Sequence, residues 1–368
     1  MTINPSSLSS SKVAQMLGSQ RVIVMIGSGG VGKTTSSVAL AVAAARAGRK
    51  VGLLSIDPAK RLADALGIRL GHELSVVHIP GASEAGGSLR AAMLDQKIVF
   101  DNMVRKHAPS ERIAEKILKD PMYIAASTNL SGPLEYMALA RLQELVDDPS
   151  MDLVILDTPP DTHALDFLGR PNVLAGFLEG KVMSKILKPV VFAGRLGLSG
   201  IATMSEKLLG GVTSVTGFGA LKKFGEFILL MQEVIEGFHK SGERVIEILK
   251  RPSSSFIIVV VPTRASVRSA QHLVDQLNEL QYSLDGVIFN RALPNQSHSG
   301  HDKLEGTEKE IIKTRSKGES AVISELRDHA SRNHRNANLW TISIAEKTED
   351  LCSVDAIVKL SDELMTAP

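Results

Sequence analysis

One short run in this 368-residue chain has the composition and spacing of a phosphate-binding loop. It fits the pattern G-x-x-x-x-G-K-[ST] and reads Gly27-Ser28-Gly29-Gly30-Val31-Gly32-Lys33-Thr34. Glycines allow backbone torsions that turn successive N–H groups towards a phosphate. In this pattern Lys33 is expected to reach the β- and γ-phosphates, and the hydroxyl of Thr34 is expected to bind Mg²⁺. The run therefore predicts a nucleoside triphosphate site with magnesium.

The same glycines also fit a second pattern, G-x-G-x-x-G, through Gly27, Gly29 and Gly32. That pattern is typical of dinucleotide-binding dehydrogenases, in which an acidic residue about 20 positions further on binds a ribose. The acidic residue after the next strand candidate, Asp57, lies about 25 positions beyond Gly32. A dehydrogenase site would also leave Lys33 without a role. We therefore favour the phosphate-loop interpretation.

Two aspartates directly follow apolar runs that have the composition of buried strands. Asp57 follows Val51–Ile56, and Asp157 follows Leu153–Leu156. The carboxyl ends of parallel strands meet at one edge of an open α/β sheet, and such sheets bind their ligands there. We therefore expect both carboxylates beside the phosphate loop, where Asp157 would orient Mg²⁺ or its bound water.

Asp57 has two interpretations. An aspartate after a strand is often a cap on the next helix, which here would run through Leu66. Its combination with a phosphate loop favours a role in catalysis. We therefore predict Asp57 and Lys33 as the catalytic residues, and the predicted magnesium ligands are Thr34, Asp57 and Asp157.

These residues need a scaffold, and the chain alternates strand-like and helix-like patterns. Continuous apolar runs, typical of strands buried on both faces, occur at 22–26, 51–56, 153–156, 256–261, 287–289 and 339–344. Helical patterns occur at 35–47, 95–107, 134–146, 267–280 and 354–365. This alternation predicts a doubly wound, mainly parallel α/β sheet.

Residues 171–250 interrupt the alternation, because they contain no strand candidate. One helical stripe there is apolar and consists of Phe224, Phe227, Ile228, Met231, Ile235 and Phe238. The stripe either covers the sheet, which is the commoner use of such a face, or forms a groove for an apolar partner. The predicted organisation is an N-terminal tail at 1–20, a nucleotide-binding domain at 21–170 and 251–368, and a helical insertion subdomain at 171–250.

Residues 291–338 form a second irregular stretch, polar and charged, with only a short helical pattern near 320–330. We expect this stretch to include a mobile loop. Its histidines lack the fixed geometry and the cysteines of a typical metal site, so a solvated loop is the better interpretation. The four histidines are His298, His301, His329 and His334.

The composition excludes several classes of protein. Lys and Arg total 42 and Asp and Glu total 40, a net charge of +2, and aromatic residues make up 4%, so neither a basic nor a base-stacking nucleic-acid surface is expected. The single cysteine, Cys352, cannot form an internal disulfide or a cysteine-based metal site, which fits a reducing compartment. We find neither a secretory signal nor an apolar run near the roughly 20 residues that span a bilayer. A cytoplasmic location is therefore expected.

Several segments together resemble the anion-transporting ATPase group of the deviant Walker A NTPases. That group includes the arsenite-pump ATPase and the targeting factor for tail-anchored membrane proteins. The resemblance covers most of the chain and is closest to the bacterial single-domain members. Its carriers are Gly27–Thr35, Asp57-Pro58-Ala59, Leu62–Leu66, Met93-Leu94-Asp95, Ser131–Glu135, Asp157–His163 and Asn290-Arg291.

The resemblance implies Mg-ATP hydrolysis by a homodimer that opens and closes with the nucleotide. Asp57 would lie in switch I and position the attacking water, and residues 157–163 would form switch II, which senses the γ-phosphate. The adenine would be bound by Asn290. The complete set of implied nucleotide contacts is Gly27 to Thr35, including Thr35 itself, then Asn290 and Arg291, with residues 344–346 flanking the base.

The chain departs from the family pattern in two respects. The family's signature lysine follows the first glycine of the loop, and this position is Ser28 here. Lys60 or Arg61, beside Asp57, could supply the missing positive charge. The metalloid-binding cysteines and the zinc-binding Cys-x-x-Cys pair of some members are also absent, so arsenite stimulation and an interface zinc are not expected.

Three functions share this phosphate-site chemistry. The helical insertion could handle an apolar client, such as a membrane-protein segment, and its methionines would suit a variable apolar ligand. Alternatively, the protein could be a regulatory or assembly switch that docks a soluble partner. A third possibility is the soluble ATPase subunit of an anion pump. The phosphate loop alone does not choose between them.

Overall fold

A computed structural model describes the chain at residues 11–57, 61–129, 134–159, 215–293, 307–333, 339–347 and 353–366. The chain divides into two compact units. The first comprises residues 1–95, 141–169 and 245–368, and the second comprises residues 96–140 and 170–244. Each unit is considered separately below.

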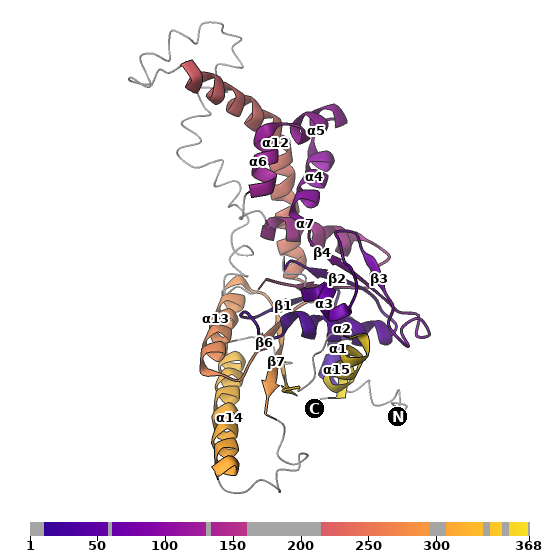
Figure 1. Ribbon diagram of the computed structural model, residues 1–368, viewed down its shortest axis with the longest axis vertical. Coiled ribbons are helices and arrows are strands. Elements are labelled where there is room, and N and C mark those ends of the chain that lie inside the picture. The colour runs from indigo at the N-terminus through magenta and orange to yellow at the C-terminus, as the bar shows by residue number, and fades with distance from the viewer. Residues whose placement is uncertain are drawn as a thin grey trace. The chain divides into compact units, whose positions relative to one another are not determined.

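The first unit is built on an eight-stranded sheet in the order β3-β4-β2-β5-β1-β6-β7-β8 (Figure 1). The strands are β1 (Val22–Ile26), β2 (Lys50–Ser55), β3 (Ser75–Val77), β4 (Ser88–Met93), β5 (Leu153–Asp157), β6 (Ser254–Val260), β7 (Leu284–Ala292) and β8 (Trp340–Ala345). Neighbouring strands pair in parallel except β3, which pairs antiparallel with β4. The predicted doubly wound, mainly parallel α/β fold is confirmed.

The six predicted strands are all present, and two further strands were not predicted. All residues of β1, β5 and β6 are buried, which explains their continuous apolar runs. The unpredicted β3 has only three residues, of which Val76 is exposed. The unpredicted β4 reads SLRAAM and contains no β-branched residue. Neither sequence therefore carries a clear strand signal.

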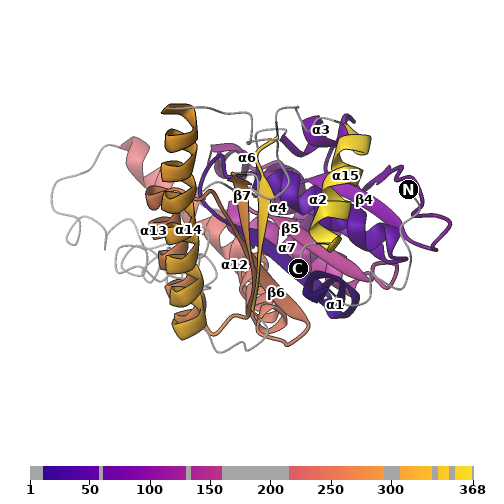
Figure 2. The same cartoon turned by 90° about the horizontal axis from the view of Figure 1, so that it is seen from below.

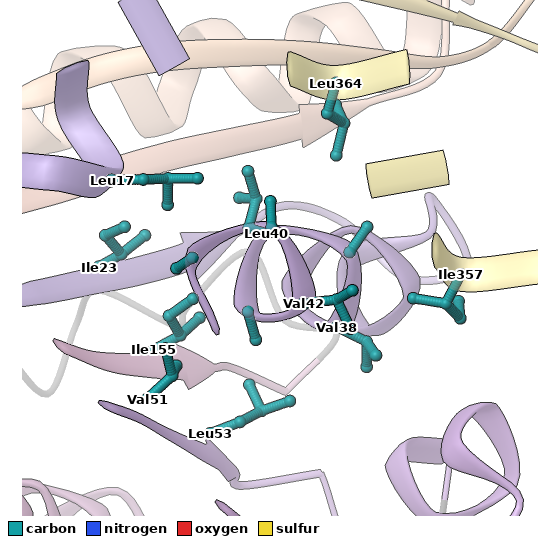
Figure 3. Close-up of a cluster of buried hydrophobic side chains, with 14 of the residues drawn as sticks. Leu17, Ile23, Val38, Leu40, Val42, Val51, Leu53, Ile155, Ile357 and Leu364 are labelled. Atoms are coloured by element: carbon teal, nitrogen blue, oxygen red, sulfur yellow. The ribbon is translucent and has the colours of Figure 1, made fainter. Parts of the chain in front are cut away.

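The principal apolar core of the first unit lies where α1 (Lys12–Ser19), α2 (Lys33–Arg46) and α15 (Val354–Thr366) pack together beside the sheet. The alanine-rich α2 is buried along most of its length, because small side chains let neighbouring backbones approach closely. Figure 3 shows side chains from these helices and from the strands converging on α2, among them Leu17, Ile23, Val38, Leu40, Leu53, Ile155, Ile357 and Leu364.

Residues 12–19, which the sequence analysis placed in an N-terminal tail at 1–20, form the helix α1. The Ser11 hydroxyl accepts a hydrogen bond from the backbone N–H of Ala14 at 3.1 Å and caps the helix. Val13, Met16 and Leu17 are buried in the core of the first unit. Their spacing of three and four residues is a helical signal, which the serine-rich surroundings obscured.

Two long helices, α13 (Arg264–Leu280) and α14 (Thr307–Asn333), lie side by side (Figure 2). The short helical pattern predicted near 320–330 is therefore part of a 27-residue helix. Its buried residues Val322, Leu326 and Ala330 are spaced four apart, a narrow stripe on a highly charged helix. His329 contacts Asp275 of α13 at 2.8 Å. The other three predicted loop histidines lie outside the described residues.

The described part of the second unit is helical. It consists of α4 (Gln96–His107), α5 (Glu111–Leu118), α6 (Pro121–Asn129) and the adjoining parts of α7 (Leu134–Asp147) and α12 (Val215–Leu249). The helices α4, α5 and α6 contact one another, and Phe100 of α4 stacks on Tyr123 of α6. Residues 96–140 thus group with 170–244, whereas the sequence-based division placed them in the nucleotide-binding domain.

The predicted apolar stripe lies on α12. Phe227 and Met231 are buried, as is Val234 on the same face, and Ile235 is half-buried. The side chains of Phe224, Ile228 and Phe238 and all residues from 160 to 214 lie outside the described residues. Among the helices that are described, none is long and apolar enough to cross a membrane.

Candidate nucleotide site

The predicted phosphate loop connects the end of β1 to the start of α2. Gly27, Gly30 and Gly32 have positive φ angles of 152°, 75° and 95°. A Cβ atom on Gly27 would lie 2.3 Å from the carbonyl oxygen of Val259 on β6. Glycine is therefore needed at this position both for its torsion and for the close approach of two backbones.

Lys33 is held inside the curve of the loop. Its ammonium group donates hydrogen bonds to the carbonyl oxygens of Gly27 and Ser28, at 2.7 and 3.0 Å. Burial lowers the pKa of Lys33 to about 8, although the nearby Asp157 and Asp57 carboxylates act in the opposite direction. The buried ammonium therefore lies where this loop pattern places the β- and γ-phosphates.

Asp157, at the end of β5, is fully buried and accepts side-chain hydrogen bonds. The hydroxyl groups of Thr34 and Ser55 donate to one carboxylate oxygen at 2.8 and 3.0 Å. The Ser37 hydroxyl lies 3.4 Å from the other oxygen and 2.9 Å from the carbonyl oxygen of Lys33, to which its one hydrogen can also be donated. Burial raises the pKa of Asp157 to about 6, and the bonds from Thr34 and Ser55 limit that rise. The loop and strands β2 and β5 thus meet at one carboxylate.

Asp57 lies next to this cluster, just beyond β2, and only 6% of it is exposed. Its backbone N–H donates to the Ser55 hydroxyl at 3.3 Å, so Ser55 links Asp57 to Asp157. The guanidinium group of Arg61, at the start of α3 (Arg61–Leu66), donates to the Asp57 carboxylate at 3.0 Å. The second predicted carboxylate is therefore beside the first, and it is paired with a cation.

The Thr34 hydroxyl and the Asp157 carboxylate form a donor set that fits Mg²⁺. Magnesium prefers hard oxygen ligands and is usually held by one or two protein groups together with phosphates and water. No group of three or more His, Cys, Asp or Glu in the described parts of the chain could hold a metal ion. The predicted role of Asp57 as a third magnesium ligand stays a prediction.

Asn290, on β7, also reaches the loop. Its side-chain amide donates to the carbonyl oxygen of Val31 at 2.8 Å, and a Cβ atom on Gly32 would lie 2.2 Å from its nitrogen. The neighbouring Arg291 has a positive φ of 55° and lines a cavity of about 690 Å³ together with Glu346. The predicted adenine contact of Asn290 stays a prediction, because its amide here bonds to the loop itself.

The predicted residues of the loop, Asp57, Asp157 and Asn290 come together at the carboxyl ends of β1, β2, β5 and β7 in the first unit. Ser37 and Ser55 were not predicted. Polar residues inside buried runs, one turn after Lys33 and two residues before Asp57, are the signal that could have identified them. The predicted Lys60 and residues 160–163 of switch II lie outside the described residues.

Comparison with known proteins agrees with this geometry. A family model described as "Anion-transporting ATPase" matches residues 20–336. The chain belongs to the anion-transporting ATPase family. The predicted family is thereby confirmed, and the match begins just before β1 and extends past Asn290 and Arg291.

Three relatives found by sequence comparison are between 25% and 28% identical to this chain. "ATPase ASNA1 homolog" of Entamoeba dispar is 28% identical over 273 residues, covering 73% of this chain and 75% of that protein. "ATPase ASNA1 homolog 1" of Paramecium tetraurelia is 25% identical over 271 residues, 73% of each chain. "ATPase get3" of Schizosaccharomyces pombe is 26% identical over 270 residues, covering 73% and 72%. The predicted ATPase activity is confirmed at the level of the family.

Proposed function

We propose that this ATPase is a Mg-ATP-driven switch, in which the hydrogen-bonded chain from Thr34 through Asp157 and Ser55 to Asp57 couples nucleotide state to conformation. The observation that carries the proposal is the shared Ser55 hydroxyl, which donates to Asp157 and accepts from the backbone of Asp57. A shift of Asp157 or Thr34 on metal binding would move Ser55 and hence Asp57. Two-state elements of this kind are what nucleotide switches require.

The residues divide the chemistry of phosphoryl transfer between them. Backbone N–H groups of the loop and the ammonium of Lys33 would neutralise the phosphates, and Thr34 and Asp157 would hold the metal. The positive charge of a Mg²⁺ ion held by these two residues would offset the negative charge that develops on the phosphates. Asp57, the second buried carboxylate, would accept a hydrogen bond from the attacking water. Positioning and charge compensation are the main requirements of this reaction.

Lys33→Ala tests the site. Electrostatic contacts of this kind contribute strongly to phosphoryl transfer, so hydrolysis of Mg-ATP should fall by about a hundredfold or more. Lys50→Ala is the matched control, because Lys50 is exposed on β2. This variant should hydrolyse Mg-ATP at the wild-type rate. Retained hydrolysis in Lys33→Ala would contradict the assignment of the nucleotide site.

We further propose that the protein works in the cytoplasm as a homodimer and that its helical unit binds a client of apolar character, such as a membrane-protein segment. The support is the family membership together with Leu229 of α12, which is 44% exposed on the side of the helix opposite the buried Phe227 and Met231. An exposed apolar side chain at that position is available to an apolar ligand.

Asp57→Asn should arrest the switch with ATP bound and thereby test the client proposal. The variant is purified with Mg-ATP, its oligomeric state is measured by light scattering, and bound polypeptides are identified by mass spectrometry. A dimer that retains apolar membrane-protein segments would support the proposal. A stoichiometric soluble partner would instead indicate a regulatory switch, and a membrane subunit would indicate part of an anion pump.

A further inference from the structure

Arg61 and Asp57 form an unequal ion pair at the edge of the nucleotide site. The Arg61 side chain is 54% exposed, whereas that of Asp57 is only 6% exposed. Asp57 is also fixed through its backbone bond to Ser55, the last residue of β2. Arg61 begins a six-residue helix, and its guanidinium group is at the end of a long, flexible side chain. When the pair separates, Arg61 is therefore the partner that moves.

The environment of the pair differs from that of an ordinary surface salt bridge. Surface pairs contribute little to stability because water screens both charges. Here one partner is buried beside a second carboxylate, Asp157, so its charge is poorly screened. The positive charge of Arg61 also acts on Lys33, whose pKa it helps to lower. Arg61 therefore belongs electrostatically to the phosphate site.

An incoming triphosphate changes the competition for Arg61. A guanidinium group has donors in a planar fork that matches a phosphate as well as a carboxylate. The site has Ser28 where a further loop cation could stand, and Lys33 is the cation inside the loop. A γ-phosphate arriving beside Asp57 would present more negative charge than that one carboxylate does.

We infer that Arg61 recognises the γ-phosphate: it pairs with Asp57 when no γ-phosphate is present and exchanges that carboxylate for γ-phosphate oxygens when a nucleoside triphosphate binds. The exchange removes the Arg61 guanidinium from the Asp57 carboxylate and brings its positive charge to the γ-phosphate. A diphosphate does not reach Arg61, so the ion pair persists. This inference rests on the proposed function and assigns to one side chain the distinction between ATP and ADP.

Binding affinities test the inference without relying on catalysis. Equilibrium dissociation constants are measured in the presence of Mg²⁺ for ADP and for a non-hydrolysable ATP analogue, using the full chain. A charge-assisted hydrogen bond typically contributes enough to change affinity about tenfold or more. Arg61→Ala should therefore weaken binding of the ATP analogue by about tenfold while changing ADP affinity less than about twofold. Arg61→Lys should recover part of the loss.

Arg69→Ala is the matched control, since Arg69 is an exposed arginine just beyond α3 and should leave both affinities unchanged. Equal affinity losses for both nucleotides, or no loss in Arg61→Ala, would overturn the inference. If Arg61→Ala does not fold by circular dichroism, Arg61→Gln replaces it. Wild-type protein that binds neither nucleotide would refute the proposed function itself, whereas wild-type binding with an unchanged ATP-to-ADP ratio in Arg61→Ala refutes only the role of Arg61.

Discussion

At the scale of single residues, the charge of the buried Asp157 carboxylate should favour catalysis but oppose folding. Its pKa is raised to about 6 because burial disfavours the charge, so its ionised form at pH 7 is maintained at a cost. Asn at this position removes the charge but keeps an oxygen that can accept from Thr34 and Ser55. The variant Asp157→Asn should lose about a hundredfold or more of Mg-dependent ATP hydrolysis, since a ligand charge is removed.

The same variant should keep its thermal unfolding midpoint at pH 7 or raise it, which scanning calorimetry without nucleotide measures. Asp152→Asn is a suitable control because Asp152 accepts a backbone bond from Lys50 and lies outside the site. That variant should hydrolyse ATP normally. If Asp157→Asn hydrolyses Mg-ATP at the wild-type rate, Asp157 does not hold the metal.

Because of Lys33, nucleotide binding should be coupled to proton uptake. Its pKa is about 8 in the protein, and bound phosphates favour the charged ammonium, so the pKa rises when nucleotide binds. Near pH 8 a fraction of Lys33 is neutral, and nucleotide binding should therefore take up protons. Near pH 6.5 Lys33 is already charged and should take up none. Titration calorimetry in buffers of different ionisation enthalpy measures this difference, and Lys33→Met should abolish it.

The lowered pKa of Lys33 also affects folding. An unfolded lysine has a pKa near 10.5, so between pH 8 and 10.5 the unfolded chain binds more protons than the folded one. The contribution of Lys33 to the free energy of unfolding therefore rises with pH across that window. Urea unfolding of wild type and Lys33→Met at pH 7.5 and 9.5 measures whether the contribution of Lys33 to the free energy of unfolding rises with pH.

At the scale of elements, two glycines in α12 should respond oppositely to the same substitution. A Cβ atom on Gly237 would lie 2.1 Å from the ring of His107 on α4, whereas a Cβ atom on Gly242 would meet nothing within 4 Å. Alanine is favoured over glycine inside helices by about 0.5–1 kcal/mol. Gly242→Ala should therefore stabilise the protein by about that amount, and Gly237→Ala should destabilise it by about 1–3 kcal/mol through overpacking.

Denaturant unfolding measures both variants, and a double-mutant cycle identifies the cause. His107→Ala should relieve most of the effect of Gly237→Ala if the ring is the obstacle, so the two changes should not be additive. Additive effects would show that the His107 contact is not responsible. Burial lowers the pKa of His107. The folded protein should therefore lose stability as pH falls below 6.5, because the unfolded chain binds a proton at His107 more readily.

The elements also show what the sequence could predict. Buried strands such as β1 and β5 were found because they contain continuous apolar runs, 22–26 and 153–156, and the loop was found because its spacing is specific. The helix α14 was mostly missed because, among its residues whose burial is described, the buried apolar ones form a narrow stripe of Val322, Leu326 and Ala330. The contact of Asn290 with Val31 joins residues far apart in the sequence, so the family resemblance could suggest that Asn290 belongs to the site, but not that contact.

At the scale of the whole molecule, the nucleotide site draws all its described residues from the first compact unit. A ligand stabilises the state that binds it, by about 2.7 kcal/mol at a hundred times its Kd. Mg-ADP at that concentration should therefore slow hydrogen exchange of the most protected amides in β1 and β5 by about a hundredfold. Amides of α5, in the second unit, should be slowed much less, as mass spectrometry of peptic fragments can measure.

Equal slowing in both units would instead indicate that they unfold together. The helices α7 and α12 each include residues of both units, so they are the elements through which such cooperativity would arise. Comparing their two halves within one exchange experiment provides an internal control. A break in protection near residue 244 of α12 is the result expected for separately unfolding units.

The packing of Trp340 on Gly286 gives the molecule an intrinsic optical probe. Trp340 is the single tryptophan of the chain, 6% of it is exposed, and a Cβ atom on Gly286 would lie 2.2 Å from its ring. Its fluorescence should therefore be blue-shifted in the folded protein and should move to longer wavelengths on unfolding. Trp340 begins β8, at the opposite end of the parallel strands from the phosphate loop. A change in its emission on adding Mg-ATP would thus show, without any label, that nucleotide binding alters the surroundings of Trp340 at the opposite end of the strands.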